Sequence, residues 1–291
     1  MNKSQPGNKS YQGSEFERIF IACLAVVTAA ILIYLTIAGP LYQKQISYRT
    51  HPDVIAQVIA QDAVNMYFLA PILIIAAWGL FNRSRWARYW LISTPLFLIY
   101  YAVSYGIGWE WMAPNYEGNS HFWFFYYLEV LIAALLMMIY GLHIFPAKQR
   151  FIVKKAQLRI YSILLGLFML MFGMMWMKEI FQLYAEGSTR GYEAAPTAFW
   201  LVRLFDLGFS IPLALLSIYL LWTRPDTSFG LQMLMYGFFL TMSVVVNAMG
   251  LMMWISKDPA YDPSGTVIFA VLMLLSVVGY LFVIRGYLRK H

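Results

Sequence analysis

The residues of this chain that could do chemistry are ionisable and amide side chains set inside long apolar segments. Asp62 and Asn65 lie three residues apart in one segment, a spacing that puts them on one helical face. Arg203 and Asp206 repeat this spacing in a later segment, and Glu129 stands alone in a third. An ionisable group inside a membrane is costly unless it is paired or hydrated, so each one is a candidate functional residue.

Three more polar residues complete the candidate set: Lys178, Glu179 and Asn247. All eight lie in the same halves of their segments, the halves that the charge distribution places outside. Four carboxylates against two basic groups leave a formal charge of −2 if the residues converge. We therefore expect an outward-facing polar cavity that binds a proton, a metal ion or a cationic solute rather than an anion.

The elements that must position these residues are transmembrane helices. Hydrophobic residues make up 61% of the 291-residue chain and charged residues only 12%, about half of what a soluble domain carries. A spanning helix needs about 20 mostly apolar residues. Eight stretches qualify, which predicts an all-α bundle with lipid as its main partner: 18–39, 60–80, 87–108, 121–145, 160–184, 197–222, 229–256 and 266–286.

The positions of Lys and Arg predict the orientation. Fifteen of the 21 fall in one set of loops and at the two ends, four fall in the opposite loops, and two fall within spans. Because positive residues accumulate on the cytoplasmic side, both termini are predicted to be cytoplasmic. The net charge of +7 is spread over short loop clusters, which argues against nucleic-acid binding.

The eight stretches predict two parallel four-helix repeats. Shifting the first four by 144 residues superposes them on the last four and aligns Asp62 with Asp206. The predicted organisation is a disordered cytoplasmic tail (1–15), a first membrane repeat (16–145), a cytoplasmic linker (146–159) and a second repeat (160–291). Evenly spaced helices could also superpose without any duplication.

No motif predicts a catalytic residue, a cofactor or a metal site. The chain lacks the Walker, HExxH, GxSxG and dinucleotide-binding patterns, and its one cysteine, Cys23, excludes an internal disulfide. The pairs Met171/Met175 and Met249/Met253 have the spacing of a Cu(I) path, but Met is also ordinary core filler.

Two segments carry a family resemblance: QDAVNMYFLAPILI at Gln61–Ile74 and RLFDLGFSIPLALL at Arg203–Leu216. They resemble the paired helix starts of an uncharacterised bacterial multi-pass membrane family of about eight spans. The resemblance implies a bacterial cytoplasmic membrane and brings no activity with it.

Three functions fit these observations. The favoured one is a secondary transporter, or a solute-binding protein, for a small cation or polar solute. A membrane scaffold or assembly subunit would use the same charges only to hold helices together. A lipid-acting enzyme would use Asp62 or Glu129 as a base. The sequence predicts neither substrate nor oligomeric state, and it favours a protein that is not an enzyme.

Overall fold

The computed structural model describes residues 13–110, 115–259 and 261–289, without the side chains of Asp53, Arg190 and Ala194. Most of the predicted tail lies outside these ranges. The described residues form helices and connecting loops, with no strand, which confirms the all-α prediction. They include eight helical spans long and apolar enough to cross a membrane: Glu15–Ala38, Ile55–Phe81, Ala87–Glu110, Ser120–His143, Lys155–Glu186, Pro196–Thr223, Phe229–Ile255 and Pro263–Leu288.

Four of the spans are single helices: α1 (Glu15–Ala38), α7 (Lys155–Glu186), α11 (Phe229–Ile255) and α12 (Pro263–Leu288). The other four are interrupted. In chain order their helices are α2 (Ile55–Val64), α3 (Ala70–Phe81), α4 (Ala87–Ile92), α5 (Pro95–Gly106), α6 (Phe124–His143), α9 (Pro196–Phe205) and α10 (Ile211–Thr223). The short α8 (Arg190–Ala194) precedes α9.

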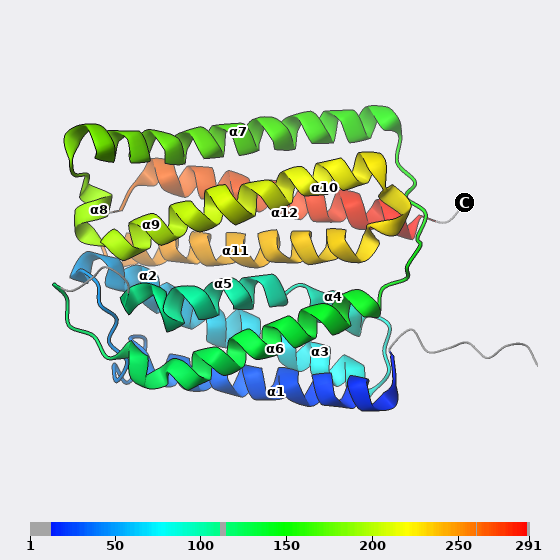
Figure 1. Cartoon of the computed structure of the whole chain (residues 1–291), viewed down its shortest axis with the longest axis horizontal. Coiled ribbons are helices and arrows are strands. Elements are labelled where there is room, and N and C mark those ends of the chain that lie inside the picture. The colour runs from blue at the N-terminus through cyan, green and yellow to red at the C-terminus, as the bar shows by residue number, and fades with distance from the viewer. Residues whose placement is uncertain (1–12, 111–114, 260, 290–291) are drawn as a thin grey trace, which may run out of the picture.

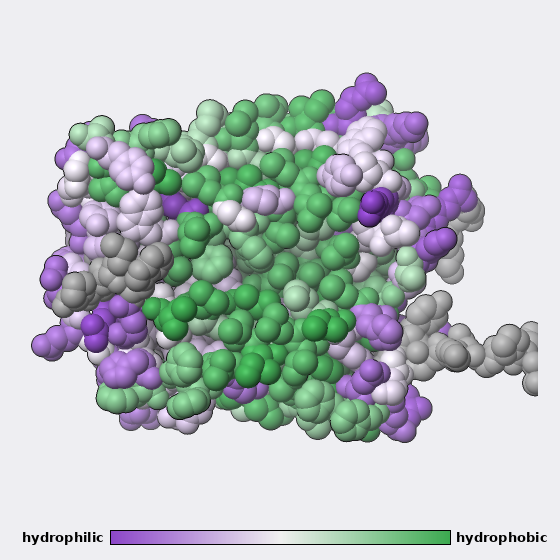
Figure 2. Space-filling model, viewed as in Figure 1, coloured by the Kyte–Doolittle hydropathy of each residue, from purple (hydrophilic) through white to green (hydrophobic). Residues whose placement is uncertain are grey.

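The spans lie side by side in one bundle (Figure 1), with α1 to α6 in the lower part of the view and α7 to α12 in the upper part. We call α1 to α6 the first half and α7 to α12 the second half. Helix α1 begins and α12 ends at one end of the bundle, the terminal end; the opposite end is the loop end. Figure 2 shows hydrophobic residues across the waist and hydrophilic residues at both ends. The chain is a multi-pass membrane protein.

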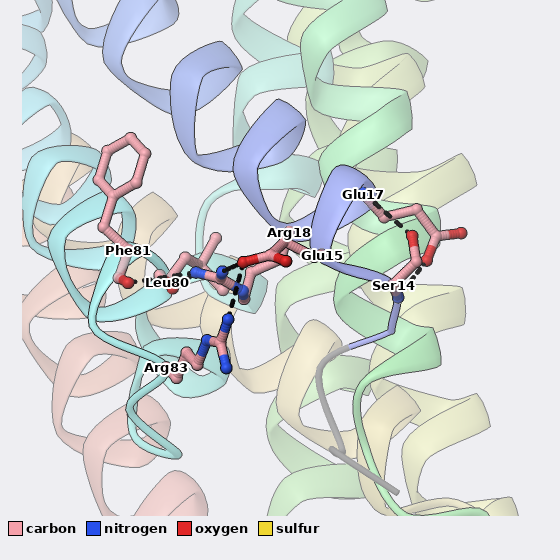
Figure 3. Close-up of polar contacts among 7 residues, drawn as sticks. All are labelled: Ser14, Glu15, Glu17, Arg18, Leu80, Phe81 and Arg83. Atoms are coloured by element: carbon pink, nitrogen blue, oxygen red, sulfur yellow. Dashed lines mark hydrogen bonds and ion pairs between the residues drawn. The ribbon is translucent and has the colours of Figure 1, made fainter.

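The start of α1 is fixed to the end of α3 (Figure 3). Arg18 is buried, and its Nη1 donates hydrogen bonds to the carbonyl oxygens of Leu80 at 2.6 Å and Phe81 at 3.2 Å. These carbonyls end a helix, where a positive charge is favourable. Glu15 accepts from both Arg18 and Arg83. Arg18 therefore connects α1 to α3, in addition to being one of the basic residues that predict the orientation.

Two spans are broken by the same device. A π turn at Asn65–Leu69 separates α2 from α3, and a second at Asp206–Ser210 separates α9 from α10. Each π turn is followed by a proline in the first turn of the next helix, Pro71 and Pro212. Proline lacks the backbone N–H and its ring displaces an upstream carbonyl, so the helix widens at this point. Such turns are frequent at functional sites.

Helix α11 joins the two halves. It packs against α12 and α10 within the second half, and against α2, α4, α5 and α6 of the first. Gly237 makes this close approach possible, because a Cβ at this position would collide with the backbone of Ser93. Helix α7 is peripheral, with α10 and the adjoining π turn as its main packing partners.

Candidate functional site

The second π turn carries a charged cluster together with α7. The guanidinium of Arg203 forms an ion pair with Glu179 of α7, and its Nη1 donates to the carbonyl of Phe199 at 3.0 Å. It also lies over the Phe199 ring at 3.6 Å and the Trp176 ring at 4.6 Å from the ring centres. Its Nε is buried without a hydrogen-bond partner. Arg203 is thus clamped between aromatic rings with one donor free.

Asp206 lies one helical turn beyond Arg203 and is 9% exposed. Its Oδ1 accepts from the Ser210 hydroxyl at 3.2 Å, and Trp176 packs beside it. Although Arg203 and Asp206 share a helical face, the ion pair of Arg203 is with Glu179 of α7. Two carboxylates and one guanidinium leave this cluster with one formal negative charge.

The first half holds a separate cluster around Asp62. Its carboxylate is 1% exposed, and its Oδ2 accepts from the backbone N–H of Leu41 at 3.2 Å. Gly39 makes the approach possible, because a Cβ there would lie 2.5 Å from Oδ2. Thr36 donates to the backbone carbonyl of Asp62 at 3.0 Å, which fixes the end of α1 to α2. Among the described residues, no Lys or Arg forms an ion pair with Asp62.

Two amides extend this cluster along α2. Gln61 donates to the side-chain oxygen of Asn65 at 2.7 Å, and both residues are buried. Asn65 is 0% exposed, yet its Nδ2 has no hydrogen-bond partner. The predicted shared face of Asp62 and Asn65 is therefore buried inside the first half.

Buried aromatic residues form a group in the same half as Asp62, and the spacing of the apolar segments does not predict them. The hydroxyl groups of Tyr48 and Tyr127 are hydrogen-bonded at 2.7 Å, and burial raises the pKa of Tyr48 well above its ordinary value, so it stays neutral. The rings form a continuous group, all buried: Tyr48, Tyr101, Tyr105, Trp109 and Tyr127. At the loop end, Arg49 pairs with Glu110 at 2.7 Å.

Helix α5 contacts residues of both clusters. Tyr100 packs on Phe205, next to the second π turn, with ring centres 4.4 Å apart. Its neighbour Tyr101 packs on Tyr127 in the first cluster. The residues of the predicted single cavity thus fall into two polar clusters, and α5 contacts both.

The other three predicted residues lie elsewhere. Glu129 lies at the seam of α1 and α6, half-buried, and its Oε1 accepts from Thr28 at 3.3 Å. Lys178 precedes Glu179 on α7 and is exposed. It joins neither cluster among the described contacts. Asn247 donates to Ser243 and Phe269 carbonyls at 2.8 and 2.9 Å, which connects α11 to α12.

The two π turns share a sequence pattern that could have been found in advance. Asn65, Phe68 and Pro71 have the same spacing as Asp206, Phe209 and Pro212. The two prolines are 141 residues apart, from 71 to 212, whereas an offset of 144 residues superposes the predicted spans. At this offset Asp206 corresponds to Asn65, and Arg203 corresponds to Asp62.

Comparison with known proteins does not assign the chain to a family. No protein-family model, curated protein or solved structure matches it. The function must therefore be inferred from the two clusters themselves.

Proposed function

We propose that the protein is a secondary transporter, or a solute-binding membrane protein, whose outward-facing site for a small cation or polar solute is the second-half cluster. The observation that carries this is the unbalanced charge of Glu179, Arg203 and Asp206 beside a broken helix. Broken helices in membranes commonly form solute sites. Glu179 is 39% exposed, whereas Asp62 is 1% exposed, so the second-half cluster is the more accessible of the two.

The chemistry favours a solute with a positively charged group. Asp206 has a hydroxyl and an indole as neighbours, and Arg203 already neutralises Glu179. An ammonium group would balance the remaining charge, and the free Nε of Arg203 could donate to an acceptor on the same solute. The charge bias of the loops supports an orientation with both termini on the cytoplasmic side. The bacterial cytoplasmic membrane is proposed from the family resemblance of the two helix starts.

A membrane scaffold is the second candidate, and a specific observation favours it. Arg203 is already paired with Glu179, and Asn247 already caps carbonyls of two helices. Contacts of this kind can hold helices together without any role in solute binding. A scaffold needs no water path to Asp206, so solute-dependent charge movement separates the two functions.

The test is current measurement on proteoliposomes adsorbed to a solid-supported membrane. Rapid exchange to Na⁺, ammonium, methylammonium or tetramethylammonium should produce a transient current with at least one cation. Asp206→Asn should abolish that current, while Glu117→Gln, at an exposed loop carboxylate, should keep it. If correctly reconstituted wild type gives no current with any of these cations, the scaffold is the better description.

A further inference from the structure

We infer that Asp62 is an occluded binding site for a monovalent cation, a proton or Na⁺, distinct from the solute site. The observation is a carboxyl group in the interior of the first half with no basic partner in the described structure. A buried carboxylate without a counter-ion is strongly unfavourable, so such a group is kept paired, protonated or bound to a metal ion. Because no basic residue pairs with Asp62 among the described residues, a bound proton or a bound metal ion remains.

The position of Asp62 further disfavours a negatively charged carboxylate without a bound cation. Its carboxylate lies against the last turn of α1, where Leu41 donates to it and the helix ends. The C-terminal end of a helix carries partial negative charge, which repels a carboxylate. One backbone N–H at 3.2 Å is the only hydrogen bond to this carboxylate among the described residues.

The surroundings supply oxygen atoms suited to a small hard cation. The hydroxyl groups of Tyr48 and Tyr127, hydrogen-bonded at 2.7 Å, are buried in the same half as Asp62. Asn65 lies one turn further along the same face; its Oδ1 accepts from Gln61, and its buried Nδ2 has no partner. Since an amide nitrogen is a donor, Nδ2 suits a carboxyl oxygen and is not itself a cation ligand. Carboxylate, amide and hydroxyl oxygens are typical ligands of such cations, and they also hydrogen-bond a protonated carboxyl.

The aromatic group encloses this site. Tyr48, Tyr101, Tyr105, Trp109 and Tyr127 are each less than 9% exposed. Towards the loop end, Glu110 accepts from Ser120 at 2.7 Å in addition to its pair with Arg49. A cation at Asp62 could exchange only after these contacts open, which is the property expected of a coupling ion in an alternating-access cycle.

Helix α5 provides the connection between the two sites. Tyr101 faces the group around Asp62, and the adjacent Tyr100 packs on Phe205 beside Asp206. Any movement of α5 that opens one site must therefore change the packing at the other. The coupling role rests on the proposed solute site; cation binding at Asp62 does not.

Two measurements on purified full-length protein test the cation site. Infrared spectroscopy at neutral pH detects a proton, as a carboxylic-acid C=O band that disappears in Asp62→Asn. Binding of radioactive sodium detects Na⁺, as an equivalent lost in the same variant. Asp62→Ser is the second variant, and Glu117→Gln, at an exposed loop carboxylate, is the control that should retain the signal.

The outcomes are distinct. A band or a sodium equivalent that depends on Asp62 supports the inference and identifies the ion. Wild type with neither signal, or with signals unchanged in both Asp62 variants, overturns it. If the Asp62 signal is present but no solute current is found, the cation site stands and the proposed transport function fails. If both are present, Asp62→Asn should still exchange solute but no longer accumulate it along a cation gradient.

Discussion

The two halves of the bundle bury their spans to different extents. In the first half, 28% to 72% of the most apolar stretch of each span is buried, against 17% to 28% in the second half. The more buried half encloses Asp62 among aromatic rings, whereas the less buried half leaves Glu179 partly exposed. The first half is therefore the more enclosed of the two, and Asp62 is buried within it. The second half presents a charged cluster on a loosely packed surface.

The largest expected effect on stability comes from the contact between Arg18, at the start of α1, and the end of α3. Arg18→Met should reduce the free energy of unfolding by about 3 kcal/mol, because two carbonyls at the end of α3 lose a charged donor. Arg159 lies 141 residues later and is exposed on α7. Arg159→Met should therefore change stability little. Thermal unfolding in detergent measures both, and equal losses would contradict the difference between the halves.

Helix packing gives a second matched pair. Ala25 of α1 is 0% exposed, whereas Gly166, 141 residues later on α7, has no atom within 4 Å of an added Cβ. Ala25→Leu should cost about 2 kcal/mol through overpacking. Gly166→Leu should be neutral or stabilising, because glycine is a poor helix former. The fraction that stays monodisperse after heating distinguishes the two, and a destabilised Gly166→Leu would show that α7 is packed more tightly than described.

The ion pair in the second half tests the open cluster. Arg203→Met should cost about 1–2 kcal/mol, between the values for exposed and buried pairs, because Glu179 keeps partial access to solvent. Adding Glu179→Gln should recover most of the loss. Adding Asp206→Asn instead should recover less, since Asp206 is not the ion-pair partner. The reverse order of recovery in unfolding experiments would mean that Arg203 pairs with Asp206.

The smallest effect is at the start of α12, which is capped by Asp262. Hydrogen bonds from the Ser264 side chain and backbone lower the pKa of Asp262. A lowered pKa in the folded state means stability that is present above the ordinary value and is lost as the pH falls through the folded value. Asp262→Ala should cost about 1 kcal/mol at neutral pH and less in acid, where the neutral carboxyl is a weaker acceptor. Asp262→Asn, still a good cap, should show a smaller loss.

The sequence was sufficient for the helices but not for their contacts. Runs of apolar residues predicted all eight spans, because length and composition decide membrane insertion; the second span nevertheless begins at Ile55 rather than 60. The spacing of Arg203 and Asp206 predicted a shared face, but it could not show that Glu179 on another helix lies nearer to the guanidinium.

The two π turns could be predicted in part from the sequence. Asn65 and Asp206 each precede a phenylalanine and a proline at the same spacing, so the pattern was readable once the prolines were aligned. The aromatic group around Asp62 was not readable, because Tyr48 and Trp109 come from loop-end segments outside the predicted spans or at their edges. Their positions depend on how distant parts of the chain pack together.

Thiol accessibility at the two carboxylates tests the contrast between an open and an occluded site most directly. In a Cys23→Ser background, Asp206→Cys and Asp62→Cys would be exposed to a charged, membrane-impermeant methanethiosulfonate added from outside. We predict that position 206 reacts at least about tenfold faster than position 62, a difference of ~1.4 kcal/mol in barrier. Equal rates at the two positions, or faster reaction at 62, would contradict the account.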